Sequence, residues 1–325
     1  MLIEVKPDYI ELLNEAVSRE IQVSLQYMLQ HSKMEKILRK TIPENVLLDK
    51  TTYEVMGKFL KEFAIQEMKH AAAVMERIYY LGGSATTKAD KPKIGNTLSE
   101  FASNGVQAEK EALELYRRII EIAGKIGDWE TRELFEKIYT EEEKHLIRFQ
   151  EYVDIIDEPE HPEAPVSVWR KVFTQDYFEM LNQAAASEIS AIIQYINQHE
   201  KANLLALRKK STPLEVVSEN NKDKIISELL KEISLQEMEH LEKISERIYL
   251  LEGETTTVPD PLPQVGESAD DFIRLGHSAE NDAIILYRTI IEEALKRGDT
   301  ATRQIFEQII IQEEEHYWKF DDYLR

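Results

Sequence analysis

The sequence of 325 residues contains no cysteine. This absence excludes disulfide bonds, thiolate catalysis, zinc ribbons and iron–sulfur clusters held by cysteine. The sequence also lacks an uncharged run near the ~18 residues that a membrane span needs, and residues 1–7 lack the long apolar core of a signal peptide. We therefore expect a cytoplasmic protein with no membrane partner. Any metal site in it must use Glu, Asp or His side chains.

Basic residues are too few to balance the acidic ones. There are 40 Lys and Arg against 61 Asp and Glu, and the formal net charge is −21 at pH 7. This charge would repel nucleic acid and anionic membrane surfaces, so we expect neither as a partner. It would attract small cations, although a solvated acidic surface without a binding role is the commoner explanation.

Helical periodicity dominates the sequence, and the helix breakers fall between the periodic stretches. Nine of the ten prolines lie outside these stretches, and Pro7 stands at the start of the first. Thr51 with Glu54 and Thr97 with Glu100 fit the pattern of a capping box at a helix start. The periodicity predicts eight helices, over residues 7–40, 51–81, 97–126, 128–155, 174–209, 221–252, 268–297 and 299–324.

The two halves of the chain repeat one another. Gln66-Glu67-Met68-Lys69-His70 returns almost unchanged at residues 236–240. Between the halves, residues 159–165 contain three prolines, a composition typical of a stiff, solvated linker. The predicted division is a first domain at 1–156, a proline-rich linker at 157–173 and a second domain at 174–325.

A long connection joins the second and third helices of each half, at residues 82–96 and 253–267. A stretch of this length can span up to ~50 Å. It could therefore cross a four-helix bundle from end to end, although a floppy hairpin would satisfy the length equally well. The fold class that we expect is all-α, with two tandem four-helix bundles.

Carboxylates and imidazoles stand on helix faces that are otherwise apolar. Residues three apart share one helix face, and a buried, ionised carboxylate is normally paired or bound to a metal. Four carboxylates and two imidazoles in each half suit two divalent iron or manganese ions. The candidate metal ligands are Glu20, Glu67, His70, Glu109, Glu142 and His145 in the first half, and Glu188, Glu237, His240, Glu280, Glu313 and His316 in the second.

A structural network of glutamate and histidine without metal is the competing explanation. Five of the eight histidines follow a glutamate by three residues, and one such pair, Glu158 with His161, lies in the linker. A single pair is therefore weak evidence. Four pairs on apolar faces, with two Glu-x6-Tyr elements in each half, favour a metal site.

A Glu from each of two helices and a Glu-x-x-His from each of the other two form the ligand pattern of ferritin-like di-iron proteins. Through these residues, Arg77 and Gly127-Asp128, the sequence resembles a tandem duplication of the bacterioferritin branch of that superfamily. The resemblance implies two ferritin-like bundles, each with a long crossover between its second and third helices, and two irons per bundle. It implies that Glu67 and Glu142 bridge the two metals, that Glu20 and His70 complete one, that Glu109 and His145 complete the other, and that the second half repeats this arrangement.

The resemblance also suggests a role for two methionines. Met68 and Met238 stand where bacterioferritins place the methionine that ligates haem, so one haem between the two halves is a further expectation. Ordinary packing methionines are the alternative. From their positions, Tyr27 and Tyr195 could serve catalysis as hydrogen-bond donors to the metal ligands or as radical traps. They could also be plain core tyrosines with satisfied hydroxyl groups.

The leading functional hypothesis is a ferroxidase that oxidises Fe(II) with dioxygen or peroxide and so detoxifies iron. One alternative is a rubrerythrin-like peroxidase with a separate electron donor. That family has a further carboxylate three residues after the third-helix glutamate, where this sequence has Ala112 and Ala283. The other alternative, an iron-storage protein, needs a cage, and the nine residues after His316 leave no room for the fifth helix of family cages.

The linker leads to a prediction about assembly. It holds the second bundle at roughly millimolar effective concentration around the first. The resemblance implies that each bundle buries a side face against a two-fold partner, so we expect the two halves to pair with each other within the chain. Light scattering coupled to size exclusion should then give a mass near 37.8 kDa or a low multiple of it. A particle of roughly twelve chains, a closed shell, would contradict the prediction.

Overall fold

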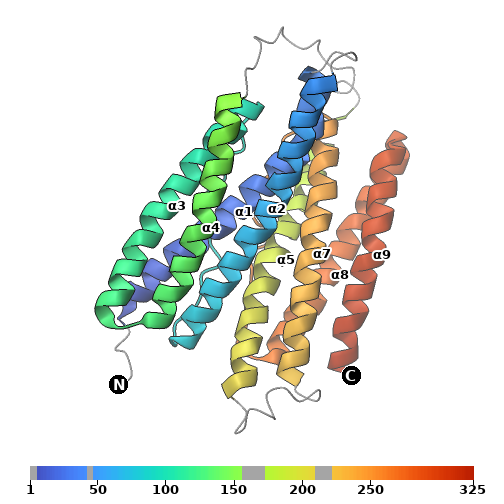
Figure 1. The fold of residues 1–325 in the computed structure, drawn as a ribbon. Coiled ribbons are helices and arrows are strands. Elements are labelled where there is room, and N and C mark those ends of the chain that lie inside the picture. Colours follow the sequence, from blue (N-terminus) through green and yellow to red (C-terminus); the bar gives the residue numbers. More distant parts are fainter. Residues whose placement is uncertain (1–5, 42–46, 156–172, 209–221) are drawn as a thin grey trace. The chain divides into compact units, whose positions relative to one another are not determined.

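The computed structural model describes residues 6–41, 47–155, 173–208 and 222–325. The chain divides into two compact units, Met1–Pro165 and Val166–Arg325. The predicted linker at 157–173 lies outside the described residues except for Phe173. The helices of the first unit are α1 (Pro7–Thr41), α2 (Leu47–Tyr80), α3 (Leu98–Ile126) and α4 (Trp129–Ile155), and those of the second are α5 (Gln175–Arg208), α7 (Lys222–Leu250), α8 (Ala269–Arg297) and α9 (Thr300–Leu324) (Figure 1).

Each unit is a four-helix bundle. In the first, α1 packs along α2 and α3 along α4, while contacts of α1 with α3 and of α2 with α4 close the bundle. In the second, α5 packs along α7 and α8 along α9, and α5 also contacts α8. The predicted all-α fold class of two tandem bundles is confirmed. One predicted helix start is wrong: α2 begins at Leu47, so Thr51 lies inside the helix and not at its N-terminus.

The long connection in each unit runs along the first helix of its bundle. Polar side chains on that helix donate hydrogen bonds to the backbone of the connection at successive points. The connection is therefore not a floppy hairpin. The contacts are Asn14 Nδ2 to Ser84 O (3.1 Å) and Gln30 Nε2 to Ile94 O (3.0 Å) in the first unit, and Asn182 Nδ2 to Glu254 O (3.0 Å) and Gln198 Nε2 to Val265 O (3.1 Å) in the second.

A buried aspartate ties the helices together at one end of the first bundle. Gly127 ends α3 with a φ of 80°, and Asp128 then accepts a hydrogen bond from the Thr131 backbone N–H (3.1 Å) at the start of α4. The same carboxylate accepts from Tyr9 Oη of α1 (3.0 Å) and from Arg77 Nη2 of α2 (2.5 Å). In the second bundle, the equivalent contacts to Asp299 come from Thr302, Tyr177 and Arg247.

One glycine in each bundle allows a close approach between two helices. A Cβ atom on Gly105 of α3 would lie 2.5 Å from the ring of Phe149 on α4, and one on Gly276 of α8 would lie 2.6 Å from Phe320 on α9. Real side chains do not pack so closely, so only glycine fits. Each glycine lies one turn before a candidate metal ligand of the same helix.

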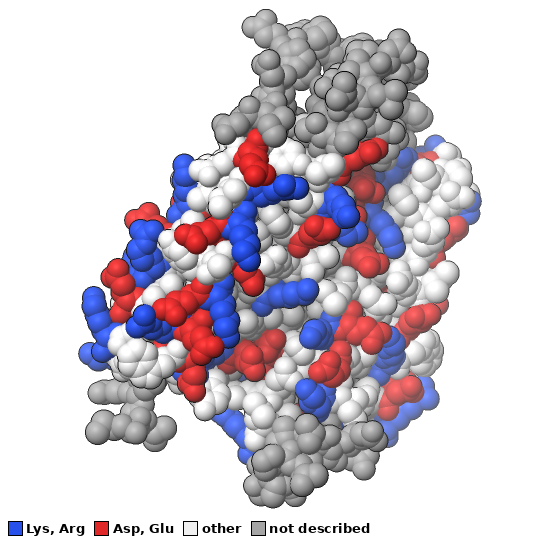
Figure 2. Space-filling model, in the orientation of Figure 1, with Lys and Arg blue, Asp and Glu red and all other residues white. Residues whose placement is uncertain are grey.

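Charged side chains of both signs cover the exposed parts of the helices. Figure 2 shows Lys and Arg interleaved with Asp and Glu on the face that it presents. The excess of acidic residues is therefore not gathered into a single patch on that face. Among the described residues, no helix is long and apolar enough to cross a membrane.

The network around Asp128 predicts a loss of stability at acid pH. Burial alone would raise the pKa of Asp128, but the hydrogen bonds from Thr131 and the charge of Arg77 hold that pKa below its usual range. A carboxyl with a lowered pKa stabilises the fold at neutral pH, and its contribution disappears as the pH falls below about 4. Asp128→Asn should lower the free energy of unfolding at pH 7 by about 3–5 kcal/mol, and by less at lower pH.

Urea denaturation at several pH values measures this effect, with Glu130→Gln as the control. Glu130 pairs with the same Arg77 at 3.1 Å, but its side chain is 73% exposed. Its loss should cost less than about 1 kcal/mol. Equal losses in the two variants would contradict the prediction.

Candidate metal centres

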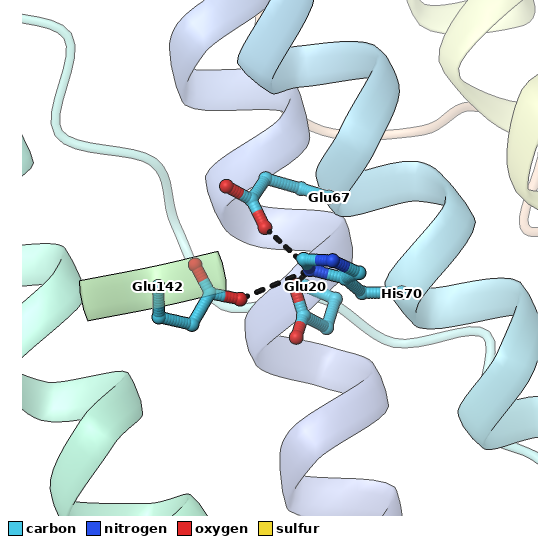
Figure 3. Close-up of side chains that lie close together, drawn as sticks. All are labelled: Glu20, Glu67, His70 and Glu142. Carbon is cyan, nitrogen blue, oxygen red and sulfur yellow. Dashed lines mark hydrogen bonds and ion pairs between the residues drawn. The ribbon is translucent and has the colours of Figure 1, made fainter. Parts of the chain in front are cut away.

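The six candidate ligands of each bundle come from four helices and meet in its core. All twelve residues are at most 5% exposed. In each bundle they form two groups whose nitrogen and oxygen atoms lie within 4.8 Å of one another. The groups are Glu20, Glu67, His70 and Glu142 (Figure 3), then Glu67, Glu109, Glu142 and His145, and in the second bundle Glu188, Glu237, His240 and Glu313, then Glu237, Glu280, Glu313 and His316.

Two carboxylates in each bundle belong to both groups. In the first bundle these are Glu67 of α2 and Glu142 of α4, and in the second they are Glu237 of α7 and Glu313 of α9. Each lies three residues before a histidine of the same helix. The geometry therefore offers two adjacent ligand groups that share two carboxylates.

Each histidine nitrogen that faces the carboxylates lies within hydrogen-bonding distance of two carboxylate oxygens. His70 Nδ1 lies 3.0 Å from Glu67 Oε2 and 3.0 Å from Glu142 Oε1, as the dashed lines of Figure 3 show. His145 Nδ1 lies 3.0 Å from Glu142 Oε2 and 2.8 Å from Glu67 Oε1. One ring nitrogen carries at most one proton, so it cannot donate fully to both oxygens.

The other ring nitrogen of each histidine is held by a residue that sequence reasoning missed. A histidine that donates its Nε2 proton outward presents its Nδ1 lone pair to a metal. In each case the residue that holds the histidine directly precedes a candidate ligand glutamate. The repeated pattern Gln/Glu-Glu-x-x-His in the sequence could therefore have indicated it. The pairs are His70 with Glu141 (2.7 Å), His145 with Gln66 (3.3 Å), His240 with Gln312 (3.2 Å) and His316 with Gln236 (2.9 Å).

The tyrosines contact candidate ligands across the bundle. Tyr27 of α1 donates a hydrogen bond to Glu109 of α3, and Tyr116 of α3 donates one to Glu20 of α1. Burial and the charge of Glu109 raise the pKa of Tyr27 well above its usual value, so its hydroxyl stays a donor at neutral pH. In the second bundle, Tyr195 donates to Glu280 and Tyr287 to Glu188.

Tyr27 and Tyr195 therefore lie beside the centres, and their satisfied hydroxyl groups agree with the simpler expectation for a core tyrosine. A catalytic role for them stays a prediction. Met68 and Met238 are only 3% and 4% exposed. Haem binding by these methionines also stays a prediction.

The donors that meet in each bundle fit divalent cations. The Oε1 atoms of all four shared glutamates are buried and accept no well-aligned hydrogen bond. A histidine Nδ1 atom lies 2.8–3.2 Å from each of them, but it also faces a second carboxylate, and buried oxygens are costly to leave poorly satisfied. Burial and the charge of Glu142 raise the pKa of Glu109 well above its usual value. Burial and Glu313 likewise raise the pKa of Glu280 to about 8. Cations placed among these oxygens would satisfy them and offset their repulsion.

Comparisons with known proteins agree with the fold. The ferritin-like domain model matches residues 10–158 and 214–325. Bacterioferritin of Desulfovibrio desulfuricans is 32% identical over 146 residues, which cover 45% of this chain and 74% of the relative. Bacterioferritin of Rhodobacter capsulatus is 33% identical over 142 residues, which cover 42% of this chain and 76% of the relative.

A solved structure of the Rhodobacter capsulatus bacterioferritin, with a metal-free dinuclear site and haem iron, aligns with 47% of this chain and 88% of its own. The sequence identity is 28% and the TM-score is 0.41.

Crowding of carboxylates predicts that the metal-free protein gains stability when one of them is neutralised. Glu280→Gln keeps the shape of the side chain and removes a charge that burial and Glu313 disfavour. Calorimetry in the presence of a chelator should show a midpoint of unfolding raised by at least about 3 °C. Glu315→Gln, at an exposed position of α9, the helix that carries Glu313, should leave the midpoint unchanged. A midpoint of unfolding for Glu280→Gln below that of the unchanged protein would contradict the predicted repulsion among the carboxylates.

Proposed function

This chain belongs to the ferritin-like family, as a tandem pair of bacterioferritin-like domains, and on that premise we propose that each bundle binds two Fe(II) ions and oxidises them. The observation that carries the proposal is the sharing of two carboxylates by the two ligand groups of each bundle. Two metal ions held side by side by common carboxylates can deliver two electrons to one oxidant. We name dioxygen or peroxide as that oxidant.

Each residue of the site has a defined part in the proposal. Tyrosine hydroxyl groups and the outward hydrogen bonds of the histidines orient the ligands, so little rearrangement is needed when iron enters. Four carboxylates balance the four positive charges of two Fe(II) ions. Glu67 and Glu142 would contact both ions, Glu20 and His70 one of them, and Glu109 and His145 the other, with Glu237, Glu313, Glu188, His240, Glu280 and His316 in the same roles in the second bundle.

Iron is the substrate of this reaction, and its electrons balance in two ways. Two Fe(II) ions and two protons reduce one dioxygen to hydrogen peroxide. Two Fe(II) ions and two protons also reduce one hydrogen peroxide to two water molecules. Both versions produce two Fe(III) ions, and neither requires an electron donor other than iron.

Other functions make different demands on the protein. Storage of the oxidised iron, in keeping with the names of the relatives, would need a closed shell. A peroxidase would need a separate electron donor, and Ala112 and Ala283 supply no additional carboxylate after Glu109 and Glu280. Manganese suits the same ligands, so metal analysis of protein purified without added metal identifies the native ion.

The proposal predicts about four bound metals per chain. Glu67→Ala combined with Glu142→Ala should halve that number, because both ligand groups of the first bundle lose their shared carboxylates. Glu76→Ala combined with Glu143→Ala changes exposed glutamates of the same two helices and should leave four. Four metals in the first double variant would mean that the ligands are wrongly assigned.

Rapid mixing of the Fe(II)-loaded protein with dioxygen or with peroxide tests the oxidation itself. The absorbance of Fe(III) should rise after mixing. In the Glu67→Ala/Glu142→Ala variant the amplitude of this rise should fall by about half, since only one of the two centres remains. Fe(III) formation no faster than in protein-free buffer, with either oxidant, would contradict the proposed reaction.

A further inference from the structure

A cavity in the second bundle connects the surface with the candidate ligands. Its volume is about 70 Å³, enough for a few water molecules. Pro261 and Asp282, which are both exposed, line its outer part. The buried carboxylates of Glu188, Glu280 and Glu313 line its inner part. The cavity therefore leads from solvent to the centre, between α5, α8 and the long connection.

Small side chains on α5 make room for this cavity. The two bundles can be aligned through Glu20 with Glu188 and through Tyr27 with Tyr195. Three residues of α5 that line the cavity are then smaller than their equivalents on α1. Ser187 stands in place of Arg19, Ser190 in place of Gln22, and Ala191 in place of Val23.

The equivalent place in the first bundle is filled by Arg19. Its Nη1 lies 2.6 Å from Glu111 Oε2, and its Nη2 donates to Ala108 O at 2.5 Å. Ala108 and Glu111 are the counterparts of Ala279 and Asp282, which line the cavity of the second bundle. The side chain of Arg19 is only 13% exposed, so it lies within the bundle surface and bridges α1 and α3.

The lining of the open cavity suits a hydrated cation. Asp282 places a carboxylate at the outer part, and the candidate ligands place several more at the inner part. The hydroxyl groups of Ser187 and Ser190 can accept hydrogen bonds from the water around the ion. Gln194, 6% exposed, also lines the cavity, and its Nε2 has no hydrogen-bond partner, so it can donate to such a water. In the first bundle, the guanidinium of Arg19 fills this space with a positive charge.

We propose that the cavity is the entrance by which Fe(II) reaches the second centre, and that Arg19 closes the corresponding entrance of the first. This inference rests on the proposed function, since it presumes that both centres bind metal. The two centres of one chain are then loaded at different rates, mainly because Arg19 stands where the second bundle has Ser187. Charge and access of this kind change association rates by factors of 10–10³.

Cobalt(II) loading tests the inference without iron oxidation. Glu67→Ala/Glu142→Ala leaves only the second centre intact, and Glu237→Ala/Glu313→Ala leaves only the first. Stopped-flow absorbance of bound Co(II) should show the second centre filling at least about tenfold faster. Arg19→Ser should accelerate the first centre and Ser187→Arg should slow the second, with the number of Co(II) bound at equilibrium unchanged in both.

Two controls separate closure of the entrance from a general effect of charge. Lys110→Ser removes an exposed positive charge next to Glu111 without opening the entrance, so the loading rate of the first centre should change less than about twofold. Arg19→Gln removes the charge but keeps much of the bulk, and should accelerate loading less than Arg19→Ser does. Circular dichroism verifies that each variant remains helical, and the exchange at Ser187 provides an independent test in the other bundle.

Each outcome bears on the inference. Equal loading rates for the two centres, with two Co(II) bound to each single-centre protein, would overturn it and leave the proposed function standing. An effect of Arg19→Ser on oxidation by peroxide but not on Co(II) loading would also overturn it, because the opening would then admit the oxidant. Absence of Co(II) binding in both single-centre proteins would overturn the inference together with the proposed function.

Discussion

The repulsion among four carboxylates buried at the middle of each bundle is the constraint on which the rest of the structure depends. Burial and neighbouring charge raise the pKa values of Glu109 and Glu280, and the buried Oε1 atoms of the shared glutamates accept no well-aligned hydrogen bond. A helical bundle selected only for stability would place apolar side chains there. The arrangement is therefore explained by a ligand that supplies positive charge, and the protein accepts a less stable metal-free state in exchange for a prepared site.

The surrounding fold holds these charges in position. The long connection is bound along α1 by Asn14 and Gln30, so the bundle must run its second and third helices in the same direction, and Asp128 joins α1, α2 and α4 at one end. Tyr27 and Tyr116 link the ligands of α1 and α3 to one another. The ligands therefore rest on rigid helices whose relative positions are fixed by polar contacts at their ends and packing between them, as a precise site requires.

The sequence alone predicted most of the fold, since apolar residues recur with helical period and breakers such as Gly127 mark the helix ends. It also predicted which charged residues meet, because charge on an apolar helix face is rare. It did not predict Glu141 as the partner of His70, or the pairing of Tyr27 with Glu109, since spacing defines one helix face and not the neighbour that faces it. The capping pattern at Thr51 misled because short patterns of this kind also occur inside helices. The difference between Arg19 and Ser187 is visible in the repeat, but its effect on a cavity needs the packed structure.

A crystal structure of the iron-loaded protein, with anomalous scattering measured at the iron absorption edge, tests the central claim most directly. Two peaks should lie between Glu67 and Glu142 and two between Glu237 and Glu313, with the members of each pair roughly 3.5–4 Å apart. Iron at surface carboxylates only, or one ion per bundle bound away from the shared glutamates, would contradict the account.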